Sequence, residues 1–151
     1  MPISTLSGQD IFRTRCQILV NTINCVGVMG AGIAAGVKSR HIDIFHQYKI
    51  SCSKGEIVPG KIIIYPITQK GYGYEYICNF PTKRDWRNNS LLEDIELGLD
   101  NLNKILLENT QYSSIAIPKL GCGLGGLNWM TVKNMIFKKL WDLPQIIQIY
   151  E

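Results

Sequence analysis

Residues 17–24 (QILVNTIN) form a short apolar run rich in β-branched side chains, and residues 25–32 (CVGVMGAG) follow as a loop with three glycines. Such a run predicts a buried strand that feeds a loop. The small and aliphatic residues at 33–38 favour a helix directly after the loop. Open α/β sheets bind ligands beyond the carboxyl ends of their strands, so this strand, loop and helix predict both a fold class and a site.

A second strand with a glycine-rich loop occurs near the other end of the chain. Residues 114–118 (SIAIP) predict another buried strand, and residues 121–126 (GCGLGG) follow it. A helix over 131–141 and a last strand over 145–150 complete this half. Both glycine loops follow strands, so both are expected at the same edge of the sheet.

Three further elements are predicted between the two loops. A helix is expected over 42–51, and strands over 61–68 and 74–80 have the spacing of an antiparallel hairpin. Leucine and isoleucine repeat every three or four residues from Leu92 to Leu106, which indicates an amphipathic helix. Ser90, three residues before Glu93, predicts a capping box. Strands alternating with helices predict an α/β sandwich around a mixed sheet.

The composition limits the class of protein. The 151 residues suit one domain, and 46% hydrophobic with 19% charged residues excludes a disordered chain. The net charge of +4 is scattered, and the densest basic stretch is residues 83–87. Five widely spaced cysteines without a CxxC pair argue against a disulfide framework and a zinc knuckle. No signal peptide or membrane span is expected, so a reduced, cytoplasmic setting is predicted.

The two glycine loops predict a phosphate site. Glycines permit close backbone approach, and the free N–H groups at the start of the following helix favour an anion. Each loop alone is better explained as a turn between strand and helix. Together they favour a diphosphate held between them. Neither loop is followed by Gly-Lys-Ser/Thr, so ATP hydrolysis is not expected.

The motifs at 8–10 (GQD), 20–24 (VNTIN), 29–33 (MGAGI) and 117–123 (IPKLGCG) resemble those of the macro domain, an ADP-ribose-binding fold. The resemblance covers nearly the whole chain and implies a single macro domain over residues 1–151, a three-layer α/β/α sandwich. Residues 79–86 (NFPTKRDW) and 121–129 (GCGLGGLNW) look most like the branch of DarG-type DNA ADP-ribosyl glycohydrolases. The terminal ADP-ribose protein glycohydrolases form a related branch.

The resemblance assigns roles to residues. Asp10 matches the acid that accepts a hydrogen bond from the adenine amino group, and Asn24 matches the asparagine that orients the distal ribose. Without the resemblance, Asp10 reads as a solvated turn residue and Asn24 as a strand end that satisfies its own backbone. The full set of implied ADP-ribose ligands is Asp10, Ile11, Asn24, Gly30, Ala31, Gly32, Ile33, Gly121, Cys122, Gly123, Leu124 and Gly125.

Lys83 matches the lysine on which glycohydrolase activity depends in both branches, so Lys83 and Asn24 are the expected catalytic residues. A lysine beside the anomeric carbon acts as a nucleophile, protonates the leaving group or orders a water. The alternative is an exposed lysine at a strand end. Two departures bear on the mechanism. Gly125 stands where the protein-directed branch has a catalytic aspartate, which favours DNA as substrate, and Asp85 stands where DarG-type sequences tend to have histidine.

The basic stretch next to Lys83 predicts a nucleic-acid contact. Arg84 and Arg87 suit phosphates, and Trp86 offers a stacking face for a single strand. Packing of Trp86 against the following helix is equally compatible with the sequence. His41 and His46 are five residues apart and do not share a helical face, so they predict no metal pair. Cys122 has no histidine near it in sequence, and Trp129 and Trp141 are expected in the core.

The resulting hypothesis is an enzyme that cleaves ADP-ribose from a DNA base, without a metal or redox cofactor. Its partners would be ADP-ribose, ADP-ribosylated DNA, single-stranded or not, and a DarT-like toxin, with no membrane. Two alternatives stay open at this point. One is a hydrolase of ester-linked ADP-ribose on proteins, and the other is a reader that binds ADP-ribose without cleaving it.

Overall fold

The computed structural model describes residues 3–151, which fold into one six-stranded sheet with helices on both faces. The strands are β1 (Ile3–Leu6), β2 (Ile18–Asn24), β3 (Ile63–Pro66), β4 (Tyr76–Lys83), β5 (Ser114–Ile117) and β6 (Ile146–Tyr150). The helices are η1 (Ile11–Arg13), α1 (Gly32–Arg40), α2 (Ile42–Ser53), α3 (Leu92–Glu108) and α4 (Trp129–Leu140).

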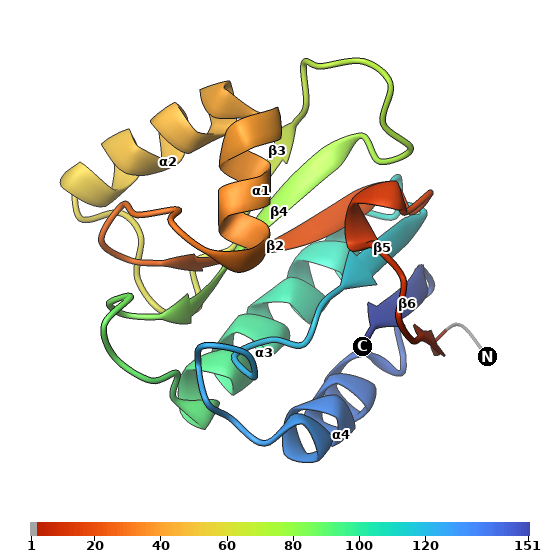
Figure 1. The fold of residues 1–151 in the computed structure, drawn as a ribbon. Helices are drawn as coiled ribbons and strands as arrows, with labels where there is room; N and C mark the ends of the chain where they lie inside the picture. Colours follow the sequence, from red (N-terminus) through yellow and green to blue (C-terminus); the bar gives the residue numbers. More distant parts are fainter. Residues whose placement is uncertain (1–2) are drawn as a thin grey trace.

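The strand order is β1-β6-β5-β2-β4-β3, and all neighbours are parallel except β3, which runs antiparallel to β4. The mixed sheet and the β3–β4 pairing confirm the sequence predictions. Because β2, β4 and β5 are parallel, their carboxyl ends meet at one edge of the sheet (Figure 1). The first glycine loop follows β2, residues 84–87 follow β4, and the second glycine loop comes after β5.

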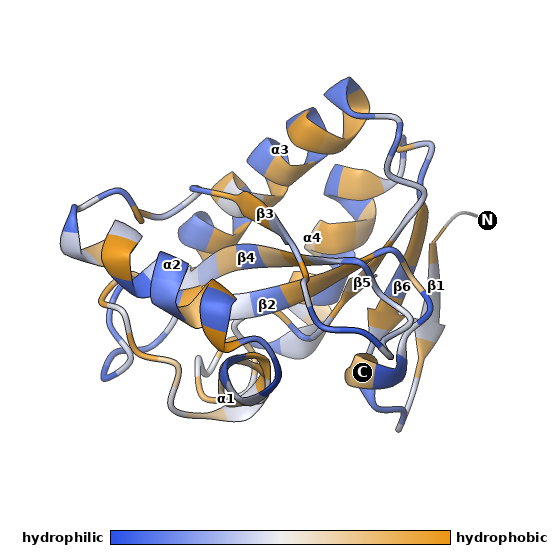
Figure 2. Cartoon of the chain, turned by 90° about the horizontal axis from the view of Figure 1, so that it is seen from above, coloured by the Kyte–Doolittle hydropathy of each residue, from blue (hydrophilic) through white to orange (hydrophobic). Residues whose placement is uncertain are grey.

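The sheet separates two apolar layers. Helices α1 and α2 cover one face and α3 and α4 the other, as Figure 2 shows from above. Val20, Phe80 and Ile117 point towards α3 and α4, whereas Leu19 and Ile77 point towards the opposite face. Successive residues of each strand therefore enter different layers, and the three-layer α/β/α sandwich is confirmed.

Some local predictions were wrong. The N-terminal strand β1 and the single turn η1 were not predicted. Strand β1 has only four residues, two of them exposed, and η1 is a single helical turn, so neither shows a clear hydrophobic periodicity. The capping box is also wrong. Helix α3 begins after Leu91, and the Ser90 N–H donates to the carbonyl oxygen of Gly125 at 2.9 Å, so Ser90 faces the second glycine loop instead. Trp141 is 66% exposed and does not belong to the core, while Trp129 is half-buried against it.

Candidate functional site

A cleft of about 880 Å³ opens at the carboxyl edge of the sheet, between the first glycine loop (residues 25–32) and the second (residues 121–126). Its size is within the usual range for a small-molecule site. All twelve residues predicted to bind ADP-ribose line this cleft, and so do Lys83 and Trp86. The structure thus gathers residues from five separate segments of the chain around one cavity.

The first glycine loop leads directly into α1. Gly32 has a φ of +56°, a backbone conformation that side chains beyond glycine rarely adopt. The N-cap residue, Ala31, has no side-chain group that accepts a hydrogen bond, and the first turn of α1 carries no acid. The N–H groups of this first turn therefore face the cleft without a competing partner from their own cap, which suits an anionic ligand.

The second glycine loop packs tightly on Ser90. A Cβ at Gly125 would overlap the Ser90 hydroxyl and the Gly121 carbonyl group, whose carbon would lie 2.8 Å away. Gly121 has a φ of +70°, and its carbonyl oxygen accepts a hydrogen bond from Leu127 N–H at 3.0 Å. No side chain fits at position 125 in this conformation. The catalytic aspartate of the protein-directed branch therefore cannot occupy this site.

Asn24 and Lys83 lie opposite each other at the ends of β2 and β4. The register of the two strands shifts between Ile23 and Asn24, so that Thr82 is an extra residue and Lys83 becomes the partner of Asn24. Such a bulge changes the direction in which side chains point at the end of a strand. Both predicted catalytic residues consequently reach the same end of the cleft.

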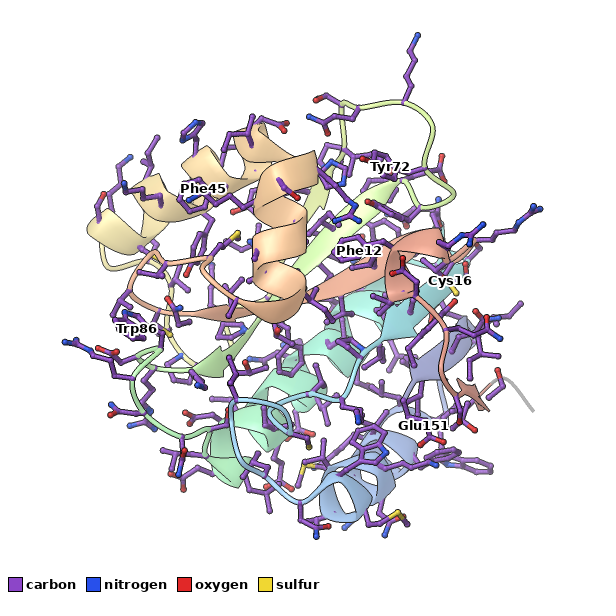
Figure 3. The ribbon with its side chains drawn as sticks, viewed as in Figure 1. Phe12, Cys16, Phe45, Tyr72, Trp86 and Glu151 are labelled. Atoms are coloured by element: carbon purple, nitrogen blue, oxygen red, sulfur yellow. The ribbon has the colours of Figure 1, made fainter. Side chains whose placement is uncertain are left out.

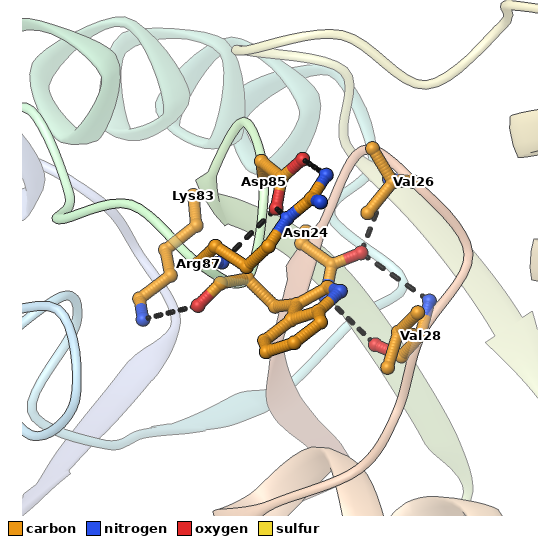
Figure 4. A network of polar contacts seen from close by, with 7 residues as sticks. Asn24, Val26, Val28, Lys83, Asp85 and Arg87 are labelled. Carbon is orange, nitrogen blue, oxygen red and sulfur yellow. Dashed lines mark hydrogen bonds and ion pairs between the residues drawn. The ribbon is translucent and has the colours of Figure 1, made fainter.

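The Asn24 side chain is held by its own loop. Its Oδ1 accepts hydrogen bonds from Val26 N–H at 3.1 Å and Val28 N–H at 3.3 Å, and its Nδ2 donates to the Val28 carbonyl oxygen at 2.8 Å (Figure 4). Asn24 therefore satisfies the backbone of the first glycine loop, as expected for a polar residue at the end of a strand. It also lines the cleft, so the two interpretations are compatible.

Lys83 is half-buried, and its Nζ donates to the carbonyl oxygen of Trp86 at 3.2 Å. Next to it, Asp85 forms a two-pronged pair with Arg87, whose Nε lies 2.9 Å from Oδ1 (Figure 4). The Arg87 hydrogen bonds lower the pKa of Asp85 to about 2. Asp85 is therefore ionised at neutral pH and is a poor proton donor, which argues against a proton-shuttling role.

The predicted DNA patch is only partly available. Arg84 donates from Nε and Nη2 to the buried Asp94 of α3, at 3.0 Å each. Arg84 and Arg87 are thus paired with acids, and neither is among the residues that line the cleft. Trp86 does line it and is 53% exposed, which leaves part of its ring available to a ligand.

The other end of the cleft is formed by η1. One carboxylate oxygen of Asp10 accepts a hydrogen bond from Phe12 N–H at 3.0 Å, which leaves the second oxygen available to a ligand. Phe12 lines the cleft here, and Figure 3 shows it well apart from Trp86, on the other side of α1. The site therefore has a carboxylate at one end and a lysine with an asparagine at the other.

The sequence interpretation missed several lining residues. Lys119 adds a cation before the second loop, and Phe12 adds an apolar wall near Asp10. Tyr150 ends β6 and Glu151 follows it, both far away in sequence. Lys119 follows the predicted strand 114–118 directly, so its position after a strand was a usable signal. The position of Tyr150 gave none, because it depends on how β6 sits in the sheet.

Other reactive side chains are unsuited to catalysis. Burial raises the pKa of the Cys122 thiol above its ordinary value, which disfavours the thiolate that a nucleophile requires. His41 is buried between Gln69 and Tyr74, with 2.6 and 2.7 Å contacts. Within residues 3–151, no cluster of three histidine, cysteine or acidic side chains is placed to bind a metal, and no helix is long and apolar enough to cross a membrane.

The fold and the cleft define a class of ligand-binding domain, and the chain belongs to the macro domain family, whose model matches residues 20–136. A DNA ADP-ribosyl glycohydrolase of Mycobacterium tuberculosis is 39% identical over 142 residues, which is 94% of this chain and 40% of that protein. The macrodomain of Mycobacterium tuberculosis DarG superposes with a TM-score of 0.89 at 39% identity and covers 97% of both chains.

A further similar structure is that of Thermosipho africanus DarTG in complex with ADP-ribose. It has a TM-score of 0.87 and 34% identity, and the match covers 98% of this chain and 41% of that one. The chain spans about two fifths of the length of the curated relatives that it matches.

Proposed function

We propose that this macro domain binds ADP-ribose and hydrolyses the N-glycosidic bond between ADP-ribose and a DNA base. The observation that carries the proposal is the pairing of Asn24 with Lys83 at one end of a cleft bounded by two glycine loops. Relatives named DNA ADP-ribosyl glycohydrolase, and a similar structure described as a complex with ADP-ribose, support it.

The ligand would extend along the cleft. The free oxygen of Asp10 would accept a hydrogen bond from the adenine amino group, which selects adenine because a carboxylate only accepts. The backbone N–H groups at the start of α1 and in the second glycine loop would hold the diphosphate. The distal ribose would then lie between Asn24 and Lys83, next to Trp86.

Hydrolysis requires a water oxygen to bond to the anomeric carbon while the carbon–nitrogen bond to the base breaks and the base nitrogen gains a proton. Lys83 Nζ donates one N–H to the Trp86 carbonyl, and its other two are available to the substrate. We propose that Lys83 supplies the charge or the proton that assists departure of the base. No electrons are transferred, and we propose that neither a metal nor a redox cofactor takes part.

Two features favour DNA over protein as the substrate. Gly125 leaves no room for the aspartate that the protein-directed branch uses. Trp86 is exposed beside Lys83, where the modified base would emerge, and an aromatic face suits a single-stranded nucleic acid. A DarT-like toxin that installs the modification would be the partner in function, and the site of action would be the cytoplasm.

Parallel assays with the same ADP-ribose label test the proposal. One substrate is a single-stranded oligonucleotide carrying ADP-ribose on a base, and the other is a protein carrying it as an ester. We expect release from the oligonucleotide at a rate far above that from the protein. Release from protein alone would indicate the ester hydrolase, and binding of ADP-ribose without release from either substrate would indicate a reader.

A further inference from the structure

The side chain of Asn24 meets one group from outside its own loop. The hydroxyl of Tyr48 lies 2.8 Å from both the main-chain oxygen and the Oδ1 of Asn24, and its single proton is shared between these two acceptors. Tyr48 belongs to α2, and none of the described residues of α2 lines the cleft. Its side chain is fully buried in the apolar layer between α2 and the sheet.

The hydrogen bonds fix which way the Asn24 amide points. The N–H groups of Val26 and Val28 donate to Oδ1, and the Tyr48 hydroxyl, whose proton is shared with the Asn24 main-chain oxygen, lies 2.8 Å from Oδ1 as well. A flipped amide would turn its NH2 group towards the two backbone N–H groups, so that donors would face donors. The observed orientation leaves one N–H of Nδ2 for a ligand, since the other goes to the Val28 carbonyl oxygen.

The Tyr48 contact differs from the other two in stiffness. Val26 and Val28 belong to a loop and are themselves exposed, and their bonds to Oδ1 are 3.1 and 3.3 Å long. The distance from the Tyr48 hydroxyl to Oδ1 is shorter, at 2.8 Å, and Tyr48 is anchored in a helix that packs on the core. A buried aromatic side chain loses its freedom through packing, so it holds its hydroxyl in place more firmly than a loop holds its N–H groups.

We propose that Tyr48 is a positioning residue for the reaction, which orients Asn24 so that a single N–H donor meets the distal ribose beside Lys83. The inference rests on the proposed function. Tyr48 acts through Asn24 and does not touch the substrate. Burial raises the pKa of the Tyr48 hydroxyl, so it remains a donor throughout the neutral range.

Tyr48→Phe removes the hydroxyl and keeps the ring. The matched control is Tyr74→Phe. Tyr74 is also buried in the same apolar layer, and its hydroxyl forms one buried hydrogen bond with His41 Nε2 at 2.7 Å. Both variants are expected to lower the melting temperature by a similar amount. On the modified oligonucleotide, kcat should fall roughly tenfold in Tyr48→Phe and stay near wild type in Tyr74→Phe, because small misplacement of a catalytic group costs rate.

Binding of free ADP-ribose separates positioning from damage to the cleft. Asn24 would give one hydrogen bond among many, so the Kd of Tyr48→Phe should stay within about threefold of wild type. Equal kcat values for the two variants at equal stability would overturn the proposal. So would a parallel loss of ADP-ribose binding in Tyr48→Phe, because that result indicates a collapsed cleft.

Nuclear magnetic resonance of the Asn24 side-chain NH2 group provides a readout that does not depend on turnover. In the wild-type chain its order parameter should match that of rigid backbone, about 0.85, and a value below about 0.6 would contradict the proposal. If wild-type protein shows no turnover on any substrate, the proposed function fails. A rigid Asn24 amide that loosens in Tyr48→Phe and not in Tyr74→Phe would then still support the role of Tyr48.

Discussion

Asn24 and Lys83 are partners across β2 and β4, at the point where a one-residue register shift ends the regular pairing of the two strands. Without the extra residue, Thr82 would stand opposite Asn24. The shift thus makes Lys83 the strand neighbour of Asn24 at the carboxyl edge of the sheet. The pairing makes the two residues neighbours, although 58 residues separate positions that face each other in these strands, as the Asn21–Asn79 contact shows.

Lys83→Ala should abolish most turnover and leave binding intact. We expect kcat on the modified oligonucleotide to fall by roughly 100- to 10,000-fold, the range for loss of an acid–base group. The Kd for ADP-ribose, measured by calorimetry, should change little, because Lys83 contacts only one end of the cleft. Unchanged turnover in Lys83→Ala would contradict a role for this lysine. Borohydride added during turnover tests for a Schiff base on Lys83, which would be reduced and trapped.

Gly125→Ala should destabilise the second glycine loop. The added Cβ meets the Ser90 hydroxyl and the Gly121 carbonyl, and overpacking of this kind costs about 1–3 kcal/mol. Gly123→Ala is the matched control, since a Cβ there meets nothing within 4 Å and the residue lies in the same loop. Thermal denaturation should show a lower melting temperature for Gly125→Ala alone. Equal stability of the two variants would show that the loop relaxes around the new side chain.

Trp86→Ala and Arg84→Gln should have different effects. Trp86 is exposed, and loss of one stacked base lowers kcat/KM on the single strand by about five- to 150-fold. Arg84 is engaged with the buried Asp94, so its replacement should lower the melting temperature and leave kcat/KM near wild type. Assays over a range of salt concentrations check this. Trp86→Ala should not change the slope of log kcat/KM against log salt concentration, because Trp86 carries no charge. A large loss of kcat/KM in Arg84→Gln at unchanged stability would argue for a direct phosphate contact.

The thiols should be inert at neutral pH. Burial raises the pKa of Cys25 to about 11 and also raises that of Cys122, so both are protonated, and therefore unreactive, well above pH 7. Iodoacetamide at pH 7.5 should leave turnover unchanged, and mass spectrometry should show slow labelling that speeds up as the pH rises. Cys122→Ser should retain kcat within about threefold. Rapid labelling of Cys122 with loss of activity at pH 7.5 would contradict this.

Local patterns predicted the strands, the two glycine loops and the edge at which they meet. Each of these depends on residues close together in the chain, such as the β-branched run before Cys25 or the glycines at 121–126. The same patterns could not predict β1, whose four residues alternate too briefly. They misassigned Ser90, because the group that its N–H meets, the carbonyl of Gly125, lies 35 residues further along the chain.

The sequence by itself therefore determined the fold class and the residues that follow each strand. The tertiary structure decided which of those residues are free and which are occupied. It pairs Arg84 with Asp94 and Arg87 with Asp85, leaves Trp86 exposed, and places the Tyr48 hydroxyl against Asn24. The physical reason is that a side chain's role depends on the partners that satisfy its polar atoms, and those partners come from segments that only folding brings together.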